Sequence, residues 1–424
     1  MHTMNKNIII KNATVVTPLG KTPKGGDSMG DLQVIENATV IVTDGIISFV
    51  GSSVDACTPA DYTYTVIDAA SRVVLPGFVD SHTHLIFGGF RPDEFGWRLN
   101  GETYMEIMQR GGGIQSTVNA TRSATIGELQ EKGQWFIDKM SEMGVTTVEA
   151  KSGYGLDTAS ELKMLDVINN LAKVPNQKLN IVATFLGAHA VPTEYKGRTA
   201  DYVDLLIREM IPAVKGKAEF FDIFTEKNVF EIEDSRKLLN AAKEAGFKLK
   251  LHADEIVTLG GAELAAETGA VSADHLLHVS DVGIKRMAQE GVVATLLPLT
   301  AFSLREPYAP ARKFIEAGAA VALATDLNPG SCFSGSIPLT IALACIYMHM
   351  SVEETITALT LNGAAALGKA NEIGTIEPGK KGDLIMLEFP NYRMLPYYVG
   401  MNCVNTTIHQ GNIVYSRKTH NNPF

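Results

Sequence analysis

Two histidines separated by one residue, His82 and His84, close the apolar run that begins at Leu75. On a β-strand, residues i and i+2 point to the same face, so the two imidazoles are expected to converge. Two neutral imidazoles at the end of a strand suit a divalent ion such as zinc or iron. The pair therefore predicts a metal site, provided that other strand ends supply further ligands.

Other short β-branched runs also end in residues that bind metals or carry protons. His252, His275 and Asp326 each end such a run, and Glu255 follows His252 by three positions. We expect His252 and Asp326 to complete the metal site, and His275 and Glu255 to handle protons beside it. Residue type alone leaves two alternatives open, because Asp326 could cap a helix and Glu255 could stand in the first turn of one.

The elements that must position these residues alternate along the chain. Short apolar runs are found at residues 73–80, 145–149, 181–186, 220–225, 248–252, 271–275, 292–297 and 321–326. Helical patterns between or after them include residues 126–142, 159–172, 233–245 and 352–366. Eight strands alternating with helices predict an α/β fold, a (β/α)8 TIM barrel. Such barrels place their chemistry at the carboxyl ends of their strands, where the candidate residues stand.

Short strands and turns occupy both ends of the chain. They are expected near residues 7–10, 13–16, 38–42 and 46–51, and again near 382–389, 404–409 and 411–415. Neither end carries enough apolar surface to be stable alone, so we expect both to pair into one small β-sandwich domain. The predicted division assigns residues 1–70 and 371–424 to this domain, and 71–370 to a metallohydrolase barrel.

Charge and composition limit the classes of partner. The 424-residue chain has a net charge of −10, and its Lys and Arg residues form no basic runs. We therefore expect no nucleic-acid partner and no membrane surface. A small anionic substrate is compatible with this charge, because one buried Arg can bind a carboxylate. No apolar stretch approaches the length of about 18 residues that a membrane span needs.

The four cysteines are scattered and form no CxxC pair. They indicate neither a disulfide framework nor a thiolate zinc site. The start of the chain also lacks the apolar core of a signal peptide, so we expect a cytoplasmic protein.

Several motifs resemble the amidohydrolase superfamily over nearly the whole chain. They are the segment 75–85, the set His252, His275 and Asp326, and the segment 374–384. Within the superfamily, the closest resemblance is to the branch that hydrolyses 4-imidazolone-5-propanoate to N-formimino-L-glutamate in histidine degradation. That resemblance rests on the segments 87–91, 149–155, 184–190, 252–255 and 324–331.

The resemblance implies a homodimer with one bound zinc or iron per chain. The positions that match the family's metal ligands are His82, His84, His252 and Asp326. In binuclear members of the superfamily, a carboxylated Lys at the end of strand 4 bridges two metals. Here the expected fourth strand, residues 220–225, contains no Lys, and Lys227 falls beyond its end, which favours a single metal.

The resemblance also implies how the substrate is held. His275 would orient the attacking water, Asp326 would accept its proton, and Glu255 would contact a ring nitrogen, although the division of proton transfer among the three stays open. Arg91 follows the first strand and is expected to bind the propionate tail, with a plain surface role as the alternative. The remaining expected substrate contacts are Tyr154, His189, Asn328, Gly330 and Ser331.

Three other functions compete with this interpretation. Another mononuclear amidohydrolase, such as a cytosine- or guanine-type deaminase, would share the metal set and release ammonia. Arg91 and the segment 326–331 favour an anionic substrate over a neutral base. A scaffold without activity usually lacks ligands, whereas all are present here, and a metal-storage protein does not need proton-handling neighbours.

Overall fold

Eight parallel strands form the larger sheet of the computed structural model, which describes residues 6–56, 61–102, 106–107 and 110–417. The strands are β6 (Phe78–Asp80), β7 (Val145–Lys151), β8 (Asn180–Ala188), β9 (Phe220–Thr225), β10 (Lys248–Ala253), β11 (Ser272–His275), β12 (Val293–Leu296) and β13 (Val321–Leu323). Each pairs with its neighbours in chain order. A parallel bridge between Thr83 and Leu327 joins the segments that follow the first and the last strand. The predicted (β/α)8 barrel is confirmed.

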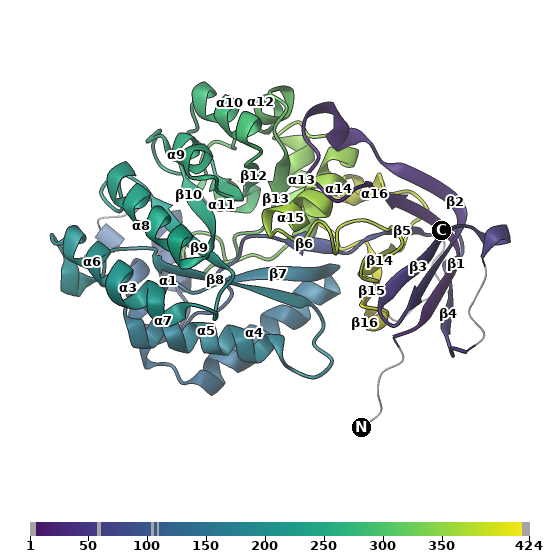
Figure 1. The fold of residues 1–424 in the computed structure, drawn as a ribbon, viewed down its shortest axis with the longest axis horizontal. Coiled ribbons are helices and arrows are strands. Elements are labelled where there is room, and N and C mark those ends of the chain that lie inside the picture. The colour runs from purple at the N-terminus through teal and green to yellow at the C-terminus, as the bar shows by residue number, and fades with distance from the viewer. Residues whose placement is uncertain (1–5, 57–60, 103–105, 108–109, 418–424) are drawn as a thin grey trace.

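Helices surround this barrel (Figure 1). The predicted helix at 126–142 is α4 (Ile126–Glu142), and Thr125 and Glu128 form a capping box at its start, which satisfies two free backbone donors. Asp157 caps α5 (Thr158–Ala172). The others are α1 (Pro92–Leu99), α3 (Ile114–Ser123), α6 (Thr199–Leu205), α7 (Ile211–Val214), α8 (Ile232–Ala245), α9 (Gly261–Thr268), α10 (Asp281–Glu290), α11 (Pro298–Leu304), α12 (Ala311–Glu316), α13 (Ile337–Ile346), α14 (Val352–Leu359), α15 (Leu361–Ala366) and α16 (Met394–Tyr397).

Both chain ends build a second, mixed sheet, seen on the right of Figure 1. Its strands are β1 (Ile8–Thr17), β2 (Gln33–Thr43), β3 (Ile46–Ser52), β4 (Thr65–Asp68), β5 (Val73–Pro76), β14 (Leu384–Leu387), β15 (Val404–His409) and β16 (Asn412–Ser416). The order is β16-β15-β14-β5-β1-β2-β3, and β4 pairs with β1. The antiparallel pairing of β14 with β5 joins the two ends, as the sequence predicted. The limits proposed above for the domains stay a prediction.

Gly77 marks the passage from the mixed sheet into the barrel. The run 73–80, predicted as one strand, is two strands: β5 belongs to the mixed sheet and β6 to the barrel. The Gly77 amide donates to the carbonyl oxygen of Asp383, and a Cβ at residue 77 would lie 2.1 Å from Oγ1 of Thr146. Only a glycine allows this close approach, so the break follows from packing rather than from hydrophobicity.

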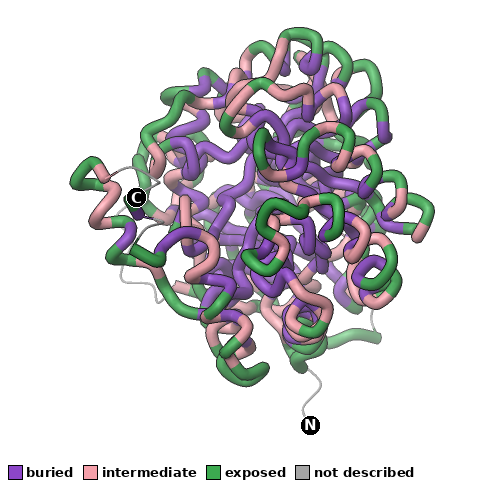
Figure 2. Tube along the Cα trace, turned by 90° about the vertical axis from the view of Figure 1, so that its left-hand side faces the viewer, coloured by how far each residue is buried: buried purple, intermediate pink, exposed green. Residues whose placement is uncertain are grey.

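Buried segments occupy the centre of the molecule and exposed turns its outside (Figure 2). None of the described helices is long and apolar enough to cross a membrane. Cys332, Cys345 and Cys403 are free thiols, and Cys57 lies outside the described residues.

Candidate metal centre and active site

Four side chains converge at the carboxyl end of the barrel. His82 and His84 follow β6, His252 lies near the end of β10, and Asp326 follows β13. Oδ1 of Asp326 is 3.6 Å from Nε2 of His82 and 3.5 Å from Nε2 of His84. The Nε2 atoms of His84 and His252 are 3.4 Å apart. All four side chains are buried, so the structure brings together the residues for which the sequence predicted a metal site.

Buried carboxylates hold the second ring nitrogen of two of these histidines. Nδ1 of His82 is 2.6 Å from Oδ2 of Asp274, and Nδ1 of His252 is 3.2 Å from the Asp222 carboxylate. These partners assign the proton to Nδ1 in each ring. The lone pair of each Nε2 therefore faces the cluster, which is the arrangement that carboxylates give to metal-binding histidines.

Two buried lysines lie against these carboxylates. Nζ of Lys151 is 2.7 Å from Oδ2 of Asp222 and 2.7 Å from Oε2 of Glu149. Nζ of Lys250 is 3.3 Å from Oδ2 of Asp274. The barrel interior is thus charged at this level, where such barrels usually carry Val, Ile and Leu. The ammonium groups hold the carboxylates as oriented acceptors for the histidine rings.

Burial keeps most of the imidazoles neutral. It is the main cause that brings the pKa of His82, His84 and His275 well below the usual range. The neutral ring carries the lone pair that metal binding requires. His252 differs, because despite burial its contact with Asp222 raises its pKa; the same contact, with Lys151, brings the pKa of Asp222 well below the usual range despite burial, so this carboxylate stays ionised.

The two predicted proton carriers lie beside this cluster. Nε2 of His275 is 3.5 Å from Oε2 of Glu255, and the His275 ring is 5.1 Å from the His252 ring. Burial, assisted by Asp326, raises the pKa of Glu255 to about 8. His275 has a φ of +77° and Asp326 a φ of +52°, a left-handed backbone that non-glycine residues rarely adopt. Such strain gathers at functional sites, where the surrounding structure maintains it.

The loop after β13 is organised by hydrogen bonds to its own residues. Oδ2 of Asp326 accepts from Thr300 at 2.7 Å, which leaves Oδ1 toward the histidines, and burial raises the pKa of Asp326 to about 6. Oδ1 of Asn328 accepts from the amides of Gly330 and Ser331, and its Nδ2 donates to the Asp326 carbonyl. The Asn328 side chain, expected as a substrate donor, is therefore engaged within the loop.

Tyr154 and His189 form a wall beside His84. The rings of His84 and His189 stack with centroids 5.0 Å apart, and the Tyr154 ring is 5.9 Å from His84 and 5.2 Å from His189. Nδ1 of His189 donates to the carbonyl oxygen of Gly153 at 3.0 Å. Burial lowers the pKa of His189 to about 3, so its Nε2 remains an acceptor. Both predicted contacts thus lie near the histidine cluster.

Arg91 reaches the loop after β13, and its side chain forms an ion pair with Glu94. Its Nε and Nη2 donate to Oε2 of Glu94 at 2.9 and 2.6 Å. A Cβ on Gly330 would lie 2.5 Å from Nη1 of Arg91, so the guanidinium lies against the loop after β13. Within the described part of the chain, Nη1 has no hydrogen-bond partner. Glu94 was not among the residues predicted from the sequence.

The charged residues that orient the histidines were also not predicted from the sequence. Asp222 interrupts the aromatic run of β9, Lys151 stands two positions after Glu149 on β7, and Lys250 stands two positions before His252 on β10. Charged residues at alternate positions of a buried strand were the available signal. Their pairing depends on which strands are neighbours, which a single sequence does not state.

Comparison with known proteins agrees with this geometry. Residues 73–414 match the model of the amidohydrolase family. An imidazolonepropionase of Phocaeicola vulgatus is 61% identical over 415 residues, which covers 97% of this chain and 100% of that protein. An imidazolonepropionase of Clostridium tetani is 57% identical and covers 97% of this chain and 99% of that protein.

The chain belongs to the amidohydrolase family.

Solved structures of the same fold include nucleobase deaminases. The 5-methylcytosine deaminase from Klebsiella pneumoniae superposes with a TM-score of 0.73 at 17% identity, covering 97% of this chain and 99% of that one. E. coli guanine deaminase superposes with a TM-score of 0.71 at 16% identity, covering 97% and 100%. At such low sequence identity, these structural similarities support only the fold of this amidohydrolase and say nothing of its substrate.

The residues present fit a divalent ion of the kind this family uses. Nε2 of His82 and Oδ1 of Asp326 are buried without a hydrogen-bond partner in the described residues, although such atoms are costly to leave unpaired. Their ligand atoms and that of His84 lie within 4.8 Å of one another. When ionised, the buried set of four carboxylates and two ammonium groups carries a net charge of −2, which a divalent ion neutralises. The set comprises Glu149, Asp222, Asp274, Asp326, Lys151 and Lys250.

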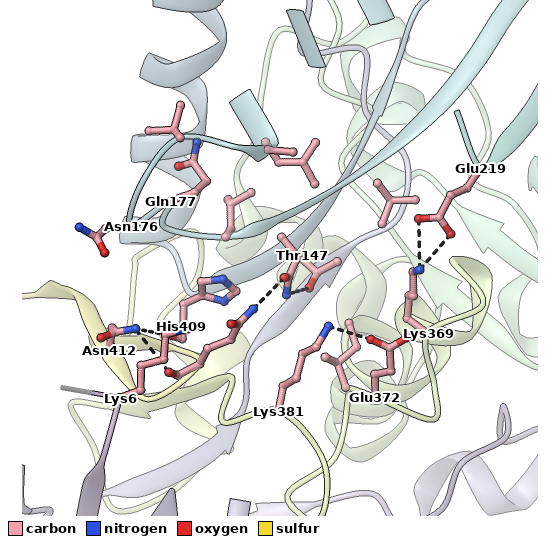
Figure 3. Close-up of a pocket in the computed structure, with 18 residues that line it drawn as sticks. Lys6, Thr147, Asn176, Gln177, Glu219, Lys369, Glu372, Lys381, His409 and Asn412 are labelled. Carbon is pink, nitrogen blue, oxygen red and sulfur yellow. Dashed lines mark hydrogen bonds and ion pairs between the residues drawn. The ribbon is translucent and has the colours of Figure 1, made fainter. Parts of the chain in front are cut away.

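A cavity at the opposite end of the barrel is separate from this amidohydrolase site (Figure 3). It has a volume of about 380 Å³ and is lined by Thr147 and Glu219, which lie where β7 and β9 begin. Lys369 pairs with Glu219 across it, and Lys381 pairs with Glu372. Each of its two carboxylates, Glu219 and Glu372, is therefore paired with a lysine.

Proposed function

We propose that this chain is a metal-dependent hydrolase that opens the cyclic amide of 4-imidazolone-5-propanoate to give N-formimino-L-glutamate. The observation that carries the proposal is the convergence of His82, His84, His252 and Asp326 beside His275 and Glu255. Relatives named imidazolonepropionase at 56–61% identity over nearly the full length support the substrate.

We assign the four converging side chains as ligands of one zinc or iron ion. When bound, the ion lowers the pKa of water toward neutrality and polarises a carbonyl group. A single ion is favoured because β9 contains no Lys, and Lys227 lies two positions beyond its last residue, Thr225. A set of three histidines and one carboxylate suits both zinc and iron, so the choice between them is left to metal analysis.

We assign a separate step of the hydrolysis to each of three side chains around this site. His275 orients the attacking water, whose oxygen forms a bond to the ring carbonyl carbon, and stabilises the developing negative charge on the carbonyl oxygen. Asp326 accepts the proton that the water gives up. Glu255, protonated below a pKa of about 8, donates a proton to the ring nitrogen as its bond to the carbonyl carbon breaks.

Groups around the site hold the rest of the substrate. Arg91 binds the propionate carboxylate, for which its Nη1 donor is suited. Tyr154 and His189 flank the ring of the substrate, since their ring centroids lie 5.9 and 5.0 Å from that of His84. Asn328 holds the amides of Gly330 and Ser331, so this loop bounds the substrate pocket as a fixed surface next to Arg91. We further propose a cytoplasmic homodimer, in line with the resemblance to histidine-degrading enzymes.

The proposal is tested by incubating the metal-loaded protein with freshly generated 4-imidazolone-5-propanoate. Metal-dependent loss of the ring absorbance, with N-formimino-L-glutamate identified by mass, supports it. Absence of turnover by a fully metallated protein, together with ammonia release from a nucleobase, would replace it with a deaminase function.

A further inference from the structure

A second arginine reaches the loop after β13. Arg98 lies in α1, and its Nη2 donates to the carbonyl oxygen of Gly330 at 3.0 Å. Arg91, the residue before α1, lies against the same glycine, since a Cβ there would be 2.5 Å from its Nη1. Two guanidinium groups from one segment therefore meet at Gly330. Nothing in the sequence motifs or the resemblance assigns Arg98 a role.

The two arginines share a single balancing carboxylate. Glu94 pairs with Arg91 and also accepts from the amide of Gly113 at 3.0 Å. In the part of the chain that the structure describes, Arg98 forms no ion pair. Burial and the nearby charge of Arg91 lower the pKa of Arg98, and the carboxylate of Glu94 acts in the opposite direction. One negative and two positive groups leave a net single positive charge, the complement of a monoanion.

Both arginines keep guanidinium donors without a partner among the described residues. Among the described residues, Arg91 donates Nε and Nη2 to Glu94, so its Nη1 is left, and Arg98 donates Nη2 to Gly330, so its Nε and Nη1 are left. The absence of a side chain at Gly330 allows the Arg91 guanidinium to approach the loop. The same loop is tied to Asp326 through Asn328, so the pair of arginines lies at the margin of the candidate active site.

We propose that Arg98 is a specificity-determining residue, which with Arg91 binds the carboxylate of the substrate's propionate tail beside Gly330. The inference rests on the proposed function and deepens it. It explains why the segment carrying α1 contributes two cations where one would suffice to attract an anion. It also predicts that the enzyme distinguishes an anionic tail from a neutral one through Arg98.

The test compares kcat/KM for 4-imidazolone-5-propanoate with kcat/KM for the analogue whose tail is the neutral propanamide. In Arg98→Met, we expect the ratio of acid to amide to fall by about tenfold or more, because a hydrogen bond to a charged group is lost. The loss should appear as a higher KM for the acid, with little change for the amide. Arg98→Lys, which retains the charge but not the planar fork, should retain part of the preference and serves if the methionine variant does not fold.

Arg110→Met provides the matched control. Arg110 stacks on Trp97 of α1 at 5.0 Å and pairs with Glu102, but its side chain is 52% exposed. This variant should leave the ratio of acid to amide unchanged. Equal losses for acid and amide in Arg98→Met would show that Arg98 only fastens the loop, and would overturn the inference. A wild-type protein that opens neither ring would remove the proposed function itself, so the two failures are distinguishable.

Discussion

The carboxylate of Asp274 lies 2.6 Å from Nδ1 of His82, while Nε2 of the same ring lies 3.6 Å from Oδ1 of Asp326. One nitrogen of the ring is thus held by a buried acceptor so that the other points into the cluster. Lys250 contacts the same Asp274 oxygen at 3.3 Å and fixes it in turn. The position of a candidate ligand therefore depends on residues that do not contact the site themselves.

Replacing Asp274 should weaken metal binding without removing a ligand. In Asp274→Ala, the His82 ring loses its orienting acceptor, and we expect the affinity for zinc to fall about 10–100-fold. Competition with a chelator measures the change. Asp166→Ala is the control, because Asp166 pairs with Lys217 on the surface. Equal affinities of the two variants would refute the orienting role of Asp274.

Replacing His252 should remove metal and activity together. In His252→Ala, the cluster loses the Nε2 atom that lies 3.4 Å from Nε2 of His84. We expect both metal content, measured by elemental analysis, and turnover to be lost. His278→Ala serves as the control, because the hydrogen bonds of His278 within the described residues involve its backbone amide and carbonyl and not its ring. Full metal occupancy in a folded His252→Ala protein would disprove the ligand assignment.

Replacing Arg91 should affect substrate binding rather than the metal. In Arg91→Ala, the tail carboxylate loses a charged donor, so we expect KM to rise by about tenfold or more at full metal content. Steady-state kinetics combined with metal analysis separates the two effects. An unchanged KM would remove Arg91 from the substrate site and leave it as the partner of Glu94.

The pH profile should show one descending limb that belongs to Glu255. Burial raises the pKa of Glu255 to about 8, so the carboxyl group holds its proton below that pH and loses it above. As a proton donor it should make kcat/KM fall tenfold per pH unit above about 8. In Glu255→Gln the rate should drop by about 10²–10⁴-fold and this limb should vanish. A limb that persists at the same pH in the variant would assign it to another group.

Gly77→Ala should destabilise the junction between the two sheets. The added Cβ would lie 2.1 Å from Oγ1 and 2.4 Å from Cγ2 of Thr146, so the backbone or this buried side chain must move. We expect the free energy of unfolding to fall by about 1–3 kcal/mol in denaturant titrations. Gly127→Ala in α4 is the control, because the nearest atom to its Cβ would be 4.0 Å away. A Gly77→Ala protein as stable as the parent would contradict the close approach.

The sequence predicted those features that follow from the regular spacing of residues along a strand. The spacing of His82 and His84, and the places of His252 and Asp326 after β-branched runs, follow from two rules: side chains alternate on a strand, and barrels carry chemistry at strand ends. The alternation of strands with helices similarly predicted the barrel. Each of these features depends on residues that are close together in the sequence.

Features that depend on contacts between residues far apart in the chain could not be predicted from the sequence. The run 73–79 contains no charged residue, so hydrophobicity does not reveal that Gly77 divides it between two sheets. Asp274 and Lys250 are neighbours because β10 pairs with β11, and Lys250 stands opposite Ser272 in that register. The same holds for Arg98 and Gly330, which are 232 positions apart in the chain.

The most direct test of the account is the reaction itself. The metal-loaded protein should convert 4-imidazolone-5-propanoate to N-formimino-L-glutamate with no release of ammonia, and a chelator should abolish the conversion. A fully metallated protein that leaves the imidazolone ring intact would contradict the central claim.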